Sequence, residues 1–216
     1  MPNHSAAVIN QKRAAAIKRF EETRHFALSL FAIKGYSNVG MRELASALGI
    51  GCGSIYNHIE SKEALLYEFF EELFDALYVQ ALQIRKRVAA RQRLRAMVKM
   101  HLALQACMPE HFQIVESEWR HLGEDLQAHA SARRLRYEEL LAESFGLGAA
   151  GHGCTASIVT LLNQSPAWLN PIAATGTARL ELMLGIIAVM VDASTETAAS
   201  DCVGANLLRK ETPRFI

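Results

Sequence analysis

Apolar side chains recur at intervals of three and four residues along most of this chain, which is the spacing of amphipathic helices. Near the N-terminus the pattern predicts helices over 17–34, 41–48 and 52–59. Gly35 follows the first as a C-terminal cap, and Gly49 and Gly51 separate the other two, where a positive φ angle would cost nothing. Two short helices joined by a tight turn are typical of a helix-turn-helix, whose second helix can enter the major groove of DNA.

The same spacing continues to residue 193 and predicts further helices and no strand. Ser61 is the expected N-cap of a long helix that ends near Val88. The later helices are expected over 92–108, 109–122, 124–145, 154–169 and 177–193, with a glycine-rich loop over 146–153. The last two are apolar on nearly all sides, so they need cover, and a second copy of the chain could supply it.

Composition and charge narrow the class of protein without naming a function. Half of the 216 residues are apolar, which allows a sizeable core, and no apolar run reaches the roughly 18 residues of a membrane span. The N-terminus lacks the pattern of a secretory signal, so we expect a cytoplasmic protein that does not enter a membrane. The net charge is +1, yet residues 1–62 carry eight basic and four acidic side chains. The excess positive charge therefore lies with the helix-turn-helix.

Five blocks of sequence stand at fixed spacing in the first 65 residues. They are LSLFAIKGY at 28–36, MRELA at 41–45, LGI at 48–50, GSIY at 53–56 and SKEAL at 61–65. Together they resemble the N-terminal signature of the TetR-type transcriptional regulators, also called the TetR/AcrR family. The resemblance implies an all-α homodimer in which a small molecule bound to the C-terminal domain releases a DNA operator.

The resemblance also divides the chain. It implies an N-terminal three-helix head with the helix-turn-helix, a long connecting helix and a C-terminal helical domain for ligand binding and dimerisation. We expect a flexible N-terminal arm over 1–16, a DNA-binding domain over 17–62, and a ligand-binding and dimerisation domain over 63–216. The dimer contact is expected on the last two helices, 154–169 and 177–193.

The head holds the candidate DNA contacts. Arg42 and Lys62 stand at helix starts, where the family contacts backbone phosphates and a helix N-terminus adds partial positive charge. An asparagine can pair with adenine, and a glycine lets the backbone approach the duplex closely. The full set is Arg42, Gly53, Ser54, Tyr56, Asn57, His58 and Lys62. Tyr56 has a second interpretation, as an apolar plug of the head.

The C-terminal helices hold a weaker signal for a ligand pocket. Polar side chains among aromatic ones are what a small-molecule site needs, although core packing and surface explain most of them equally well. The candidates are His101, Phe112, Glu116, Trp119, Arg120 and Trp168. The four cysteines are widely separated, and histidines ten residues apart cannot chelate from one helix turn. We therefore expect no metal site, and the sequence indicates no cofactor.

The segment 161–171, taken with 133–140, is similar to a TetR subgroup whose members often sense acyl-CoA thioesters. An acyl-CoA thioester is therefore one candidate effector. Arg133, Arg134 and Arg136 could meet a nucleotide phosphate, or they could form a solvated helix face.

The prediction from sequence is thus a ligand-responsive DNA-binding transcriptional regulator, a repressor of a palindromic double-stranded operator. The alternative is a helical adaptor with weak DNA affinity. It is motivated by Gly40 and Cys52, which stand where the family usually has a capping hydroxyl and a lysine. An enzyme would need a nucleophile motif, a phosphate-binding glycine loop or metal spacing, and the sequence offers none of these. We therefore expect no catalytic residues.

Overall fold

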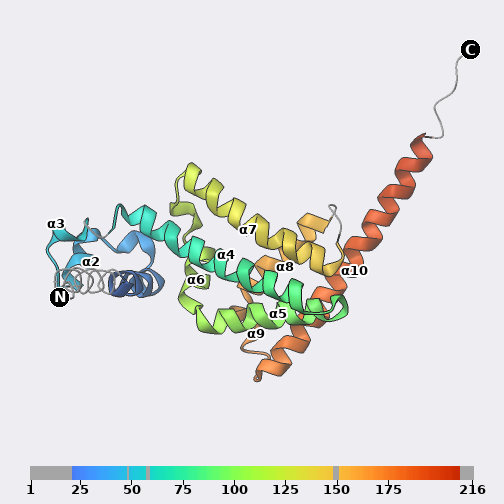
Figure 1. Cartoon of the computed structure of the whole chain (residues 1–216), viewed down its shortest axis with the longest axis horizontal. Helices are drawn as coiled ribbons and strands as arrows, with labels where there is room; N and C mark the ends of the chain where they lie inside the picture. The colour runs from blue at the N-terminus through green and yellow to red at the C-terminus, as the bar shows by residue number, and fades with distance from the viewer. Residues whose placement is uncertain (1–20, 48, 57–58, 148–150, 210–216) are drawn as a thin grey trace, which may run out of the picture. The chain divides into compact units, whose positions relative to one another are not determined.

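The computed structural model describes residues 21–47, 49–56, 59–147 and 151–209. Within these ranges every regular element is a helix (Figure 1). The all-α prediction is therefore confirmed. None of the helices among these residues is both long enough and apolar enough to cross a membrane.

The helices follow the predicted order along the chain. Residues 21–34 are helical, and the later elements are η1 (Tyr36–Asn38), α2 (Met41–Ala47), α3 (Cys52–Ile55), α4 (Lys62–Arg87), α5 (Ala90–Cys107), α6 (Pro109–Ser117), η2 (Trp119–His121), α7 (Glu124–Phe145), α8 (His152–Asn163), α9 (Ser165–Leu169) and α10 (Gly176–Arg209).

The helices form two compact units. The first comprises the chain up to Leu73 together with Met108–Ala130, and the second comprises Phe74–Cys107 together with the chain from Ser131 onwards. The first unit therefore combines the helix-turn-helix with α6, η2 and the start of α7. Both α4 and α7 contribute residues to each unit.

Local signals place the helix ends in the first unit. Gly35 ends the first helix with a φ of 81°, a conformation that costs glycine little. The Ser61 hydroxyl accepts the main-chain N–H of Ala64 at 2.9 Å and so caps α4. Pro109 lies in the first turn of α6, where its missing N–H is no loss.

An aromatic core holds the first unit together. Phe31 lies edge-on to Phe69, with ring centroids 6.2 Å apart, and Trp119 packs against Phe70. These side chains come from the first helix, α4 and η2, so burying them fixes three segments that are far apart in sequence.

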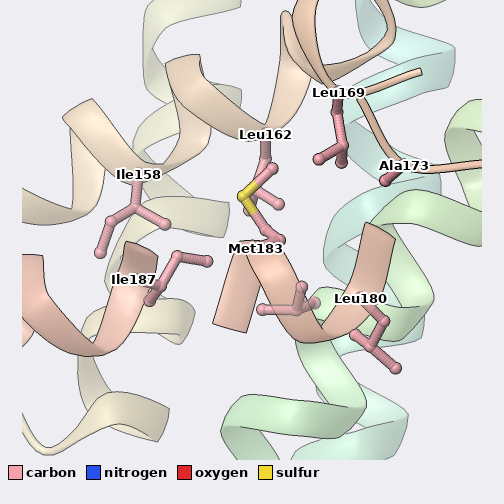
Figure 2. Packing of buried hydrophobic residues seen from close by; sticks show 8 residues of the cluster. Ile158, Leu162, Leu169, Ala173, Leu180, Met183 and Ile187 are labelled. Carbon is pink, nitrogen blue, oxygen red and sulfur yellow. The ribbon is translucent and has the colours of Figure 1, made fainter. Parts of the chain in front are cut away.

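A second apolar cluster is built mainly from α8 and α10. Figure 2 shows Ile158 and Leu162 of α8 facing Met183 and Ile187 of α10, and all four side chains are buried. Leu169, Ala173 and Leu180 extend this cluster. The apolar faces predicted for the last helices thus pack partly on each other within one chain.

The observed helix boundaries differ from the prediction in several places. Of the helix expected over 52–59, α3 covers Cys52–Ile55, and a turn follows at Tyr56. The helix expected over 154–169 is divided at Gln164 into α8 and α9, because Pro166 lacks an N–H and fits only the first turn of a new helix. The helix expected over 109–122 ends at Ser117 and is followed by the short helix η2. The last helix extends beyond Ala193 to Arg209, since its polar continuation contains no proline to stop it.

Candidate functional site

The helix-turn-helix is formed by α2 and α3, which pack on each other within the first unit. Gly49 lies between them with a φ of 64°, as the sequence predicts. Gly51 differs from expectation: its φ is −65° and its backbone is extended, so it serves as the N-cap of α3 and does not use the left-handed conformation. The turn therefore needs glycine at one of these two positions.

The start of α2 retains a cap despite the missing hydroxyl at Gly40. The carbonyl of Gly40 accepts the N–H of Leu44 at 3.0 Å, which makes it the N-cap residue. Glu43 hydrogen-bonds both to the ammonium of Lys34, at 2.5 Å, and to the N–H of Gly40. Chiefly because of Lys34, the pKa of this carboxyl is lowered. The glutamate half of a capping box thus compensates for the residue that the family usually places there.

The segment after the turn has one buried and one exposed face. Ile55 is fully buried and Ile59 nearly so, and they anchor α3 and the following turn to the head. Gly53 and Ser54 are exposed, and 55% of the Tyr56 side chain is accessible. The aromatic ring of Tyr56 therefore lies at the surface and does not plug the core. Asn57 and His58, predicted DNA contacts, lie outside the described residues.

The two predicted phosphate contacts are placed differently. Arg42 is exposed in the first turn of α2. The ammonium of Lys62, at the first residue of α4, lies 3.8 Å from the ring centroid of Tyr36 and 5.8 Å from that of Phe31. This desolvation lowers the pKa of Lys62, and Glu118 acts in the opposite direction. Lys62 thus has an aromatic partner inside the first unit, which the sequence did not indicate.

The surroundings of Lys62 include a polar cluster from η2 and its N-cap. Glu118 is 7% exposed as a residue, and its Oε2 lies 2.9 Å from Nδ1 of His121. Nε2 of the same histidine lies 2.8 Å from the Ser37 hydroxyl. Sequence reasoning missed Glu118 as part of the head, because no spacing rule relates it to Lys62, some 56 positions earlier in the chain.

A second polar cluster fastens the first helix of the head. The Arg24 guanidinium bridges Glu68 and Glu72 of α4. The other oxygen of Glu72 lies 2.9 Å from Nε2 of His111 on α6. The hydrogen bond from His111 is the main cause of the lowered pKa of Glu72. One carboxylate therefore links the first helix, α4 and α6.

The predicted pocket residues fall into both units. Phe112 is buried, Trp119 packs on Phe70, Glu116 is half-buried and Arg120 is exposed, all in the first unit. His101 is fully buried in the second unit, where its Nδ1 lies 2.9 Å from the Tyr137 hydroxyl. Burial lowers the pKa of His101 to about 3. Trp168 packs against the α8–α10 cluster.

The three arginines of α7 have partners within the second unit. Arg133 donates to both oxygens of Asp75 at 2.7 and 2.8 Å, and Arg136 lies over the ring of Tyr78 at 4.5 Å. Arg134 donates to Glu138 and to the hydroxyl of Thr160. These contacts tie α7 to α4 and α8. Among the described residues, no group of three His, Cys, Asp or Glu side chains is placed to hold a metal ion.

The second unit also carries an open groove of roughly 540 Å³ on α8 and α10. It is lined by Ala156, Ser157, Thr160, Leu161, Gln164, Ile186 and Met190. Val189 and Leu182 of α10 are exposed apolar side chains, the first with 69% of its surface accessible. None of the described side chains that we predicted for the ligand pocket lines this groove.

A helix-turn-helix with one buried anchor face and one exposed face, carried by an otherwise helical chain, defines a helical DNA-binding protein. The model described as bacterial regulatory proteins, tetR family, matches residues 25–69, and that of the tetracycline repressor-like C-terminal domain matches residues 87–172. The chain belongs to the TetR family of transcriptional regulators.

Known relatives agree with this assignment. The repressor KstR2 of Mycolicibacterium smegmatis is 33% identical over 66 residues, which are 31% of this chain and 32% of KstR2. A tetR-family regulator from Rhodococcus RHA1 has a TM-score of 0.68 at 21% identity, covering 81% of this chain and 96% of its own. AibR, solved with isovaleryl coenzyme A and operator DNA, has a TM-score of 0.66 at 23% identity, covering 78% and 97%. The chain spans between about a fifth and a third of the curated relatives' length.

Proposed function

We propose that this protein is a homodimeric repressor that binds a palindromic operator through residues 17–62 and leaves it when a small molecule binds to residues 63–216. The observation that carries the proposal is the exposed row Gly53, Ser54 and Tyr56 on a segment anchored by buried Ile55. A recognition helix needs this division, because one face must reach the groove while the other holds it to the head.

The contacts to DNA follow from the charges and helix ends of the head. Arg42 and Lys62 would meet backbone phosphates beside the N-termini of α2 and α4, which favour anions. Such contacts set the position of the protein on the duplex. Ser54, Tyr56, Asn57 and His58 would then contact base edges or phosphates in the major groove.

A second copy of the chain is the proposed cover for the groove on α8 and α10. The apolar side chains Leu161 of α8 and Ile186 and Met190 of α10 line it, and Val189, next to Met190 in the sequence of α10, is exposed. A symmetric dimer through these helices would present two heads to one duplex. Its recognition helices would read half-sites about 34–36 Å apart, one turn of B-DNA. A ligand that favours another separation would reduce the DNA-bound population.

An acyl-CoA thioester is the first effector class to test. The segment 161–171 is similar to a subgroup that often senses these compounds, and AibR, of the same fold, was solved with isovaleryl coenzyme A. The proposed pocket residues are His101, Phe112, Glu116, Trp119, Arg120 and Trp168. Mass spectrometry of small molecules that remain with the purified protein, followed by titration of coenzyme A and short acyl-CoA thioesters, tests this class against others.

Fluorescence anisotropy with duplexes from upstream of the protein's own gene tests the DNA-binding proposal. Binding should weaken steeply as the salt concentration rises. Arg42→Ala should reduce the affinity, and it should reduce the slope of log affinity against log salt concentration by about one unit per head, because a protein with one phosphate contact fewer displaces fewer counterions from DNA. Arg91→Ala, at an exposed position of α5, is the matched control and should change neither quantity. A chain that binds no duplex at any salt concentration is not an operator-binding protein.

The adaptor alternative makes the opposite prediction for the same assay. Joint replacement of Tyr56 and Lys62 by Ala would leave DNA affinity unchanged if the head had lost its DNA-binding role. A repressor should lose most of its affinity, since the hydroxyl and the ammonium are removed from the proposed interface.

A further inference from the structure

We infer that Glu118 is a positioning residue for the ammonium of Lys62 and limits the strength with which this lysine holds a DNA phosphate. The inference rests on the proposed function, because it concerns DNA binding by the head. It adds a residue outside the helix-turn-helix to the groups that determine operator affinity.

The position of Lys62 determines how much of its charge a DNA phosphate can meet. As the first residue of α4, it lies where a helix N-terminus favours an anion such as phosphate. Its ammonium nevertheless lies 3.8 Å from the ring centroid of Tyr36, within the range of a cation–π contact. The side chain is half-buried and does not extend freely into solvent. Part of the charge that a phosphate would meet is thus already engaged inside the unit.

Glu118 is buried in the first unit. A buried carboxylate needs hydrogen bonds and a nearby positive charge. Glu118 accepts a hydrogen bond from the Ser117 hydroxyl at 3.2 Å and lies 2.9 Å from His121. The ring of His121 in turn packs on Tyr36, with centroids 5.1 Å apart, and Tyr36 is the ring over which the Lys62 ammonium lies. Glu118 raises the pKa of Lys62 against the effect of desolvation, so the ammonium acts as a counter-charge for the buried carboxylate.

Two anions, the Glu118 carboxylate and a DNA phosphate, would compete for the Lys62 ammonium. A phosphate that approaches α4 must attract an ammonium that already interacts with Tyr36 and Glu118. This competition reduces the number of counterions that Lys62 displaces from DNA, and that number sets the salt slope. Replacing the carboxylate with an uncharged isostere should release the lysine for the duplex.

Glu118 relates DNA binding to a part of the chain outside the helix-turn-helix. It lies between α6 and η2, whereas Tyr36 and Lys62 belong to the head. A Cβ built at Gly35 would lie 3.8 Å from Oε1 of Glu118, so the carboxylate reaches the end of the first helix. Any change that moves η2 would therefore change the charge available at the start of α4.

The test is a double-mutant cycle in the full-length protein, measured by fluorescence anisotropy on one duplex over a range of salt concentrations. Glu118→Gln should tighten binding about threefold to tenfold and steepen the salt slope by about one unit per head. In a Lys62→Met background the same substitution should change neither value. Glu124→Gln removes an equal charge from an exposed site in the same unit and should leave both unchanged.

A second readout needs no DNA. The Tyr36 ring should shift the NMR signals of the Lys62 ε-methylene upfield, and Glu118→Gln should move them towards those of a solvated lysine. If Glu118→Gln does not fold, Tyr36→Leu provides the second variant, and it should steepen the salt slope in the same way. A purely structural role of Glu118 would change the stability of the protein but not the slope.

The outcomes separate the inference from the proposed function. If no variant binds DNA, the proposed function fails and the inference fails with it. If the wild-type protein binds DNA and Glu118→Gln changes nothing, the inference alone is wrong. It is also overturned if Glu118→Gln has the same effect with and without Lys62, because the carboxylate would then act on DNA directly.

Discussion

The side-chain amide of Gln105 on α5 donates to the main-chain carbonyl of Asn163, the last residue of α8, at 2.7 Å. It also donates to the carbonyl of Leu162 at 3.1 Å, and its oxygen accepts the hydroxyl of Ser165 at 2.8 Å. These carbonyls lie at the C-terminal end of α8, next to the break at Gln164, and Asn163 and Ser165 on either side of the break are buried. Gln105 supplies additional hydrogen bonds at a helix end, where main-chain carbonyls need partners from outside the helix.

Gln105→Leu should therefore destabilise the protein by about 2–4 kcal/mol, because several buried polar groups lose their partner at once. Chemical denaturation followed by circular dichroism measures the change. Gln92→Leu, at an exposed position of the same helix, should change the free energy of unfolding by less than about 0.5 kcal/mol. Equal effects of the two substitutions would contradict the assigned role of Gln105.

The buried His101 should make stability depend on pH. Its pKa is lowered to about 3 in the folded chain, against about 6.5 when unfolded. The unfolded chain therefore binds the proton first, so this contribution is complete above pH 6.5 and is lost as the pH falls towards 3. Between pH 7.5 and 5.5 the wild-type protein should lose about 1 kcal/mol more than His101→Gln. Denaturation curves at the two pH values measure this, and parallel losses would argue against a buried neutral histidine.

Substitutions at the neighbouring residues Tyr56 and Ile55 should affect different properties, DNA binding and stability respectively. Tyr56→Phe should leave the free energy of unfolding unchanged but weaken DNA binding by about tenfold, if the exposed hydroxyl hydrogen-bonds to a phosphate. Ile55→Ala should cost about 2–5 kcal/mol, since its side chain is fully buried. Paired denaturation and anisotropy measurements separate the two roles, and a large loss of stability in Tyr56→Phe would restore the interpretation of Tyr56 as a plug.

The dimer contact can be tested with two equally simple substitutions. Val189 on α10 and Val79 on α4 are exposed apolar residues, with 69% and 54% of their surfaces accessible. Val189→Glu should produce monomers in light scattering coupled to size-exclusion chromatography, because a charge would be buried in the proposed interface. Val79→Glu should leave the dimer intact. Dissociation caused only by the second substitution would place the interface on another face.

Only part of the candidate site could be predicted from the sequence. The anchor and exposed positions of α3 follow from local spacing, and the blocks around Arg42, Tyr56 and Lys62 identify the family. The partners of Lys62 cannot be predicted in this way, because only folding brings Glu118 close enough to act electrostatically on it, and no sequence pattern links the two positions. The pocket candidates illustrate the same point. The sequence places both His101 and Arg120 near aromatic residues, but it does not predict that His101 is buried and Arg120 exposed.

By itself the sequence determined the helical class, the order of the helices and most of their ends. These features depend on contacts between residues three or four apart and on helix-end residues such as Gly35, Ser61 and Pro109, so short stretches of sequence are enough to predict them. Tertiary structure alone decided that Gln105 satisfies the broken end of α8, that Glu72 joins three helices, and that Lys62 lies on Tyr36 beside Glu118. Such contacts join distant segments, and their energies depend on burial, which exists only once the chain has folded.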